Sequence, residues 1–194
     1  MADYLGPNPS EQEEFTVTPE MMEAALKYYR EHHKYLEEAA ATAREDAVSH
    51  RGCKVGCCLM AIHPQGAKQG EYAIYTGYNV TPEPNLNRRG KDKRCAERNV
   101  LERAIGDGCK FVPALVTVSN FVDTGDPSKA HDCLHPCKDC RDLLRELVDK
   151  GVLSRESMFC SANDAANGQD GKLTWRIEEM TVGQLLDLYH DDLS

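Results

Sequence analysis

Two short cysteine motifs, roughly forty residues apart, constrain this chain more than any other feature of its sequence. The first is Cys95-Ala96-Glu97, and the second is Pro136-Cys137-Lys138-Asp139-Cys140. Both stand at predicted helix starts, and Cys137 and Cys140 are one turn apart, so their thiols lie on one helix face. A metal bound to all three cysteines requires a fold that brings two helix N-termini together.

Three thiols and one carboxylate match the needs of a catalytic zinc. Such a zinc has three protein ligands and an open fourth position, whereas a structural zinc closes its shell with four protein ligands. If Cys95, Cys137 and Cys140 are the ligands, Glu97 stays outside the shell and is free to transfer the proton of a bound water. The alternative is that Glu97 only interacts with the positive end of its helix dipole.

Three thiolates around one Zn²⁺ leave the site with a net negative charge, which weakens the metal as a Lewis acid. A compensating cation is therefore expected near the sulfurs. Arg98 follows Cys95 by three residues and can reach back to the ligand thiolates. The alternative for Arg98 is an ordinary surface ion pair.

Two rival uses of these cysteines remain open. A closed structural zinc site built from Cys133, Cys137, Cys140 and His131 or His135 is chemically sound, but it leaves Cys95-Ala-Glu without a role. A redox pair at Cys137 and Cys140 lacks the thioredoxin-like strand context that such motifs have. The remaining cysteines with no ligand pattern are expected in the core: Cys57, Cys58, Cys109 and Cys160.

Composition favours a zinc-binding protein of a reducing compartment. The 194-residue chain has nine cysteines, an odd number, and 41% hydrophobic residues, enough for one packed domain. We expect that domain over residues 16–194 and a mobile, acidic segment over 1–15. The chain lacks a signal-peptide pattern and a run of about 18 apolar residues, so a cytoplasmic location without membrane contact is expected. The net charge of −9 disfavours binding to nucleic acid.

The hydrophobic pattern predicts a mixed three-layer α/β/α arrangement with a central β-sheet. Helices are expected at about 18–46, at 95–105, at 137–150 and from Thr181 onward. Strands are expected at 54–62 and 72–80 as a hairpin, at 112–119, at 157–161 and near 173–176.

The motifs resemble those of the cytidine deaminase superfamily, in the branch with three cysteine ligands, which has Cys-Ala-Glu-Arg and Pro-Cys-x-x-Cys. The likeness runs from about residue 48 to 190. It includes the strand at 54–59, the Gly-x-Asn-Val stretch at 77–80 and the C-terminal segment at 180–186.

This resemblance implies a cytidine deaminase-like fold and a hydrolase that holds one Zn²⁺ per subunit. It also implies roles for individual residues. Cys95, Cys137 and Cys140 are the ligands, Glu97 is the proton shuttle, and Arg98 neutralises the thiolates. Asn79 contacts the sugar, and the Ala96 backbone contacts the base. A homotetramer is implied as well, and the apolar Leu185, Leu186, Leu188 and Tyr189 are candidates for a subunit contact.

The chain departs from the family pattern at positions that contact the substrate in the family. Thr81 stands in place of the sugar-binding glutamate, a loss that the blasticidin S deaminases share, and Cys53 stands in place of the base-stacking aromatic residue. The longer segment 81–94 carries a basic cluster in which Arg88, Arg89 and Lys91 could bind an anionic group. The alternative is a solvated loop.

Three functions follow from these expectations. The first is a zinc-dependent deaminase that converts cytidine, deoxycytidine or a modified analogue to the uracil-type product and releases ammonia. The second is a deaminase of another aminated heterocycle, a nucleotide or a nucleoside antibiotic of the blasticidin S kind. The third, a polynucleotide-editing or nucleic-acid-binding protein, is disfavoured by the isoelectric point near 5.3 and the single tryptophan.

Overall fold

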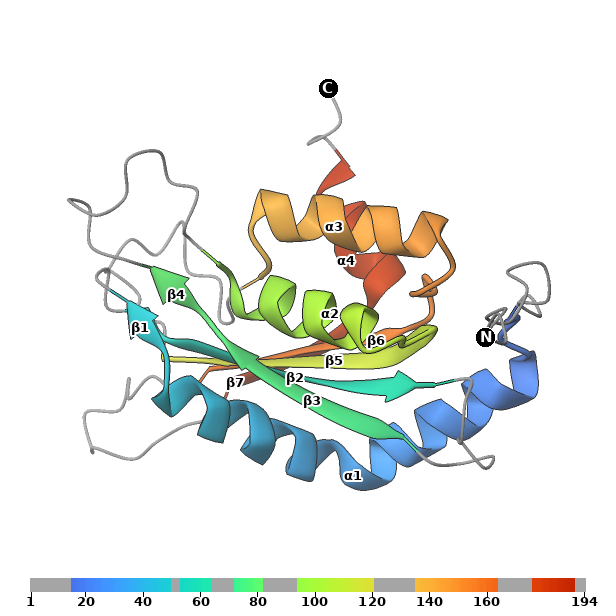
Figure 1. Cartoon of the computed structure of the whole chain (residues 1–194), viewed down its shortest axis with the longest axis horizontal. Coiled ribbons are helices and arrows are strands. Elements are labelled where there is room, and N and C mark those ends of the chain that lie inside the picture. The colour runs from blue at the N-terminus through green and yellow to red at the C-terminus, as the bar shows by residue number, and fades with distance from the viewer. Residues whose placement is uncertain are drawn as a thin grey trace, which may run out of the picture.

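The computed structural model describes residues 15–49, 53–63, 72–81, 94–120, 135–163 and 176–190. Its helices are α1 (Pro19–Glu45), α2 (Ala96–Gly106), α3 (Lys138–Asp149) and α4 (Val182–Leu188). Its strands are β1 (Val48–Ser49), β2 (Val55–Ile62), β3 (Ala73–Tyr78), β4 (Val80–Thr81), β5 (Phe111–Ser119), β6 (Met158–Asn163) and β7 (Arg176–Thr181). Helix α1 covers one face of the sheet, and α2, α3 and α4 lie on the other (Figure 1). The predicted three-layer α/β architecture is therefore confirmed.

Five strands form the main sheet in the order β3-β2-β5-β6-β7. Strand β2 is antiparallel to both β3 and β5, so the predicted hairpin is present. Strands β5 and β6 are parallel, and β7 is antiparallel to β6. A parallel pair needs a crossover connection, and α3 lies in the segment that makes it.

Helix α1 begins and ends within a residue of its predicted bounds. Thr18 is the N-cap, and its hydroxyl accepts a hydrogen bond from the backbone of Met21 at 3.2 Å. The buried residues of α1 recur at helical spacing and face the sheet: Met22, Ala25, Tyr29, Leu36 and Ala40. The helix lies very close to β2, because a Cβ added at Gly56 would come within 1.9 Å of the Ala40 carbonyl oxygen.

The opposite face carries the helices that begin at the two motifs. Helices α2 and α3 end just before Gly108 and Gly151, whose φ angles of +87° and +71° belong to the left-handed region that glycine adopts easily. The cysteines predicted for the core are buried: Cys57, Cys58, Cys109 and Cys160. The apolar side chains beneath α2 and α3 form the larger core and fix both helices on the sheet.

The structure corrects two of the expected strands. The run at 72–80 is interrupted at Asn79, and β4 pairs in parallel with β1, which the sequence pattern did not predict. The last strand, expected near 173–176, continues to Thr181 although it contains Glu178 and Glu179, while residues 173–175 lie outside the described residues. Pairing with β6 along all six residues overrides the weak strand propensity of the glutamates.

Some expectations fall on residues that the structure does not describe. Residues 1–14 are among these, so the mobile segment at 1–15 and the extent of a single domain over 16–194 stay predictions. Across the helices that are described, none combines the length and apolarity that crossing a membrane demands.

Candidate active site

The three motif cysteines converge where two helices begin. Cys95 is the N-cap of α2, Cys137 is the N-cap of α3, and Cys140 lies in the first turn of α3. The Cys137 sulfur is 3.3 Å from that of Cys95 and 3.6 Å from that of Cys140. All three sulfurs lie within 4.8 Å of one another, and no other cluster of this kind occurs among the described residues.

This donor set fits zinc. Zinc–thiolate bonds of about 2.3 Å in a tetrahedral shell place neighbouring sulfurs about 3.8 Å apart. The two sulfur–sulfur distances of 3.3 and 3.6 Å are close to that value. Three donors leave one tetrahedral position for water or substrate.

Hydrogen bonds within the cluster raise the pKa of two of its thiols, Cys95 and Cys140. The bond with Cys137 is the main reason why the pKa of Cys95 is raised to about 12, and it also raises the pKa of Cys140 strongly. Burial and the charge of Glu97 act in the same direction on both thiols. A bound metal cation reverses this balance, because it binds thiolates and displaces their protons.

Glu97 faces the sulfurs from the first turn of α2. Its side chain is buried, with 6% exposure, although a carboxylate is rarely found in such a place without a function or a partner. The Cys140 thiol points at its Oε2 atom from 3.9 Å. Burial raises the pKa of Cys57 in the strand below, and the negative charge of Glu97 adds to that effect. A carboxylate is thus held directly beside the three clustered sulfurs.

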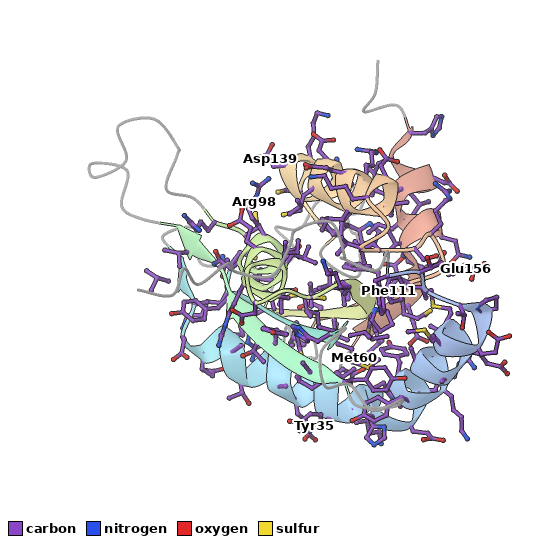
Figure 2. The ribbon with its side chains drawn as sticks, turned by 45° about the vertical axis from the view of Figure 1, so that its right-hand side comes forward. Tyr35, Met60, Arg98, Phe111, Asp139 and Glu156 are labelled. Carbon is purple, nitrogen blue, oxygen red and sulfur yellow. The ribbon has the colours of Figure 1, made fainter. Side chains whose placement is uncertain are left out.

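Arg98 links the starts of the two helices. One guanidinium nitrogen donates to the backbone oxygen of Asp139 at 3.3 Å, and the other lies 3.5 Å from Glu102. Figure 2 labels Arg98 and Asp139, which lie near each other at the starts of α2 and α3. The pairing with Glu102 is a surface ion pair of the kind considered as the alternative role of Arg98. The bond to Asp139 also links Arg98 to the turn that contains Cys140.

Asn79 holds the start of β2. Its Oδ1 atom accepts from the Val55 backbone at 2.8 Å, and its Nδ2 atom donates to the Cys53 carbonyl at 3.0 Å. An amide side chain has two donors and two acceptor lone pairs, so these bonds leave capacity for a ligand. Ala96 is fully buried in the first turn of α2, and its carbonyl oxygen lies against Gly77 of β3.

Other candidate residues are separate from the cluster or lie outside the described residues. His135 does not join the sulfurs, because its ring nitrogens are 2.8 Å from the Tyr189 hydroxyl and 2.8 Å from Glu178. His131 and Cys133 are not described, and neither are Arg88, Arg89 and Lys91 of the basic segment. The side chain of Thr81 also lies outside the description.

Two residues next to the second motif were not predicted as parts of the site, and one of them, Tyr189, was considered only for a subunit contact. Arg141 is buried, donates to the Pro136 carbonyl at 2.5 Å, and has its guanidinium carbon 3.9 Å from the centre of the Tyr189 ring. The position of Arg141, directly after a metal-binding cysteine, was a signal that could have drawn attention to it. Tyr189 carried no such signal, because it is distant from both motifs in the sequence.

Comparison with known families identifies the class of protein. The model of the cytidine and deoxycytidylate deaminase zinc-binding region matches residues 29–154, which is more than half of the chain. The chain is a zinc-dependent hydrolase, consistent with its cluster of three thiols. It belongs to the cytidine and deoxycytidylate deaminase family, which confirms the resemblance seen in the motifs.

The chain is also similar to solved structures, and the first of these supports the fold. The chain is similar to a cytidine deaminase from Burkholderia pseudomallei, with 22% identity and a TM-score of 0.54 over 79% of this chain and 94% of that one. A cytidine deaminase from Mycobacterium leprae has 22% identity and a TM-score of 0.47, covering 79% and 95%. One from Mycobacterium tuberculosis has 20% identity and a TM-score of 0.47, covering 79% and 92%. A comparison with curated protein sequences finds no match.

Proposed function

We propose that this deaminase acts on a cytosine-type nucleoside, namely cytidine, deoxycytidine or a modified analogue, and yields the uracil-type product. The observation that carries the proposal is the convergence of three thiol sulfurs with the buried carboxylate of Glu97, 3.9 Å from the Cys140 sulfur. Water adds to the ring carbon that bears the amino group, the carbon–nitrogen bond breaks, and ammonia leaves.

Each group has a defined task in this proposal. Cys95, Cys137 and Cys140 hold one Zn²⁺, which when bound supplies Lewis acidity and lowers the pKa of water. Glu97 takes a proton from the attacking water and delivers protons to the ring nitrogen and to the departing amine. Its burial beside the sulfurs keeps this carboxylate close to the reacting atoms and limits contact with bulk solvent.

Three sources of positive potential offset the charge of the thiolates. Cys95 and Cys137 are helix N-caps, so the N-terminal dipoles of α2 and α3 are directed at the sulfurs. Arg98 adds a full charge while it is bonded to the Asp139 carbonyl, one residue before Cys140. We propose that Arg98 acts through space and by fixing this turn.

For the substrate, we propose that Asn79 contacts the sugar and that the Ala96 backbone contacts the base. Asn79 supports this role because its backbone-bonded amide is held in a fixed orientation at the start of β2. A base-stacking aromatic is replaced by Cys53, whose smaller side chain packs against the core. That substitution favours a second candidate, in which the substrate is another aminated heterocycle, a nucleotide or a nucleoside antibiotic.

An ammonia-release screen tests the substrate class. The zinc-loaded protein is offered cytidine, deoxycytidine, their monophosphates, an aminoacyl-cytosine antibiotic, and aminated purine and pterin analogues. A cytosine-type nucleoside is expected to give the highest kcat/KM, within the ordinary enzyme range of about 10⁴ to 10⁸ M⁻¹s⁻¹. Faster turnover of a purine or pterin would replace this proposal with the second candidate.

The basic segment is tested by charge removal. If Arg88, Arg89 and Lys91 bind an anionic substrate group, neutralising all three raises KM for that substrate and flattens its salt dependence. The kcat for a neutral nucleoside stays unchanged. Lys34→Gln, at an exposed lysine on α1, is the control for loss of surface charge. Unchanged KM and salt dependence in the triple variant would leave the segment as a solvated loop.

We also propose a cytoplasmic location and a homotetrameric assembly. None of the eight described cysteines forms a disulfide bond, which suits a reducing compartment. The proposal of a tetramer rests on the resemblance to the family.

A further inference from the structure

A set of buried and partly buried side chains lies directly behind the second cysteine motif. His135 precedes Cys137 by two residues, and its side chain is only 9% exposed. Its Nε2 atom donates to the Glu178 carboxylate of β7 at 2.8 Å, because a carboxylate can only accept. Its Nδ1 atom lies 2.8 Å from the Tyr189 hydroxyl. Both ring nitrogens of His135 are thus held by side chains from distant parts of the sequence.

Tyr189 contacts the same motif a second time through Arg141. The guanidinium carbon of Arg141 lies 3.9 Å from the centre of the tyrosine ring, within the range of a cation–π contact. The Nη1 atom of the same guanidinium donates to the Pro136 carbonyl at 2.5 Å. Tyr189 therefore contacts His135 with its hydroxyl and Arg141 with its ring face, and these two residues flank the segment 136–140.

The main chain of Tyr189 is also attached to α3. Arg145 donates from Nη2 to the Tyr189 carbonyl at 2.9 Å, and it is oriented by an ion pair with Asp142 at 2.8 Å. The preceding part of α4 is fixed in the core by Leu185 and Leu186, which are buried. The end of α4 is therefore a rigid support for the turn at Pro136 and Cys137.

This support matters because Cys137 is one of the three clustered thiols, with its sulfur 3.3 Å from that of Cys95 and 3.6 Å from that of Cys140. Residues that orient a metal ligand without touching the metal are commonly worth about 10-fold to 100-fold in metal affinity.

We propose that Tyr189 is a positioning residue for Cys137, acting through His135 and Arg141, so that docking of α4 and retention of zinc are coupled. The inference rests on the proposed ligand set, but it does not depend on which heterocycle is the substrate.

Zinc release from the intact, zinc-loaded chain is the direct test. Tyr189→Phe keeps the ring under Arg141 and removes only the hydroxyl contact with His135, whereas Tyr189→Ala removes both contacts. With a colorimetric zinc chelator, release is expected to be about 10-fold faster for Tyr189→Phe and about 100-fold faster for Tyr189→Ala. Asp187→Asn is the matched control, because Asp187 lies on the same helix and pairs with Arg155 outside this network.

Cobalt substitution separates positioning from general stability. In Tyr189→Ala, the thiolate-to-cobalt absorption is expected to lose intensity as Cys137 leaves the shell, while Tyr189→Phe and Asp187→Asn keep the wild-type spectrum. A purely structural role would lower the urea midpoints of the zinc-loaded and metal-free protein equally, and release rates and spectra would match the wild type. That result overturns the proposal.

A cysteine variant separates this inference from the ligand set. Cys137→Ala is expected to lose tightly bound zinc. Loss of zinc in Cys137→Ala together with unchanged release in both Tyr189 variants would overturn the positioning role and leave the ligand set standing. Tight zinc in Cys137→Ala would overturn the ligand set and the positioning role together.

Discussion

At the scale of single residues, the candidate active site lies in the first turns of two helices. Cys95 and Cys137 occupy N-cap positions, and neither thiol makes a capping hydrogen bond. Polar N-cap side chains normally serve the helix itself. Here the two thiols do not cap their helices, and their sulfurs lie 3.3 Å from each other.

Glu97→Gln tests the proton shuttle. The amide keeps the size and polarity of the side chain but cannot accept and return the proton, so activity is expected to fall by several orders of magnitude. Zinc content and thermal stability should stay at wild-type values. Glu146→Gln, at an exposed carboxylate paired with Lys150 on α3, is the control and should retain full activity. Activity of Glu97→Gln within tenfold of wild type would end the assignment.

At the scale of elements, the active site depends on how closely helices approach the sheet. Gly77 allows α2 to lie on β3, since a Cβ there would be 3.2 to 3.3 Å from atoms of Ala96 and Val100. Gly56 allows the still closer approach of α1 to β2 on the opposite face. These contacts hold β2 and β3 between two helices, and Asn79 at the end of β3 is placed beside the start of β2.

Gly56→Ala is expected to destabilise the protein strongly. The added methyl group would be 1.9 Å from the Ala40 carbonyl oxygen and 2.6 Å from the Arg44 nitrogen, and both are backbone atoms that cannot move alone. Overpacking of this kind costs about 1–3 kcal/mol and occasionally more, so we expect a loss of about 3 kcal/mol in the free energy of unfolding. Urea denaturation measures it.

Gly106→Ala is the control for that variant. Gly106 ends α2, and a methyl group there meets nothing within 4 Å. Alanine is more favourable than glycine in a helix by about 0.5–1 kcal/mol, so the free energy of unfolding should be unchanged or slightly higher. Equal urea midpoints for Gly56→Ala and Gly106→Ala would show that α1 can shift away from β2 at little cost.

At the scale of the whole molecule, the C-terminal stretch has two different roles. Leu185 and Leu186 are buried in the core of this chain, so they are not available for the subunit contact suggested by the sequence. Leu188 is 60% exposed and remains available. Tyr189 lies against the second cysteine motif instead. Any contact between subunits on this helix must therefore use its outer face.

The tetramer is a prediction that mass measurement can test. Light scattering at micromolar concentration is expected to give the mass of four copies of the 21.7 kDa chain. Leu188→Asp should shift the distribution toward smaller species if this residue lies in an interface, because a charge would be buried there. Tyr35→Asp, at an exposed tyrosine on α1, is the comparison on the opposite face. A monomer mass for the unmodified chain would contradict the assembly.

The sequence alone determined the elements whose signals are local. Thr18 and Pro19 marked the start of α1, and glycines marked the ends of α2 and α3, because caps and left-handed turns depend on the residue itself. The motif spacing likewise predicted Cys95, Cys137, Cys140 and Glu97 as site residues. Three cysteines and a carboxylate at two helix starts fit few roles other than metal binding and proton transfer.

Only the tertiary structure decided what depends on partners far away in the sequence. The β1–β4 pair and the extent of β7 exist because other strands supply their hydrogen bonds. Arg98 is bonded to Asp139 because α2 and α3 begin side by side, and Tyr189 meets His135 and Arg141 because α4 folds back onto α3. Such contacts carry no local pattern, because their geometry is set by packing over the sheet rather than by neighbouring residues.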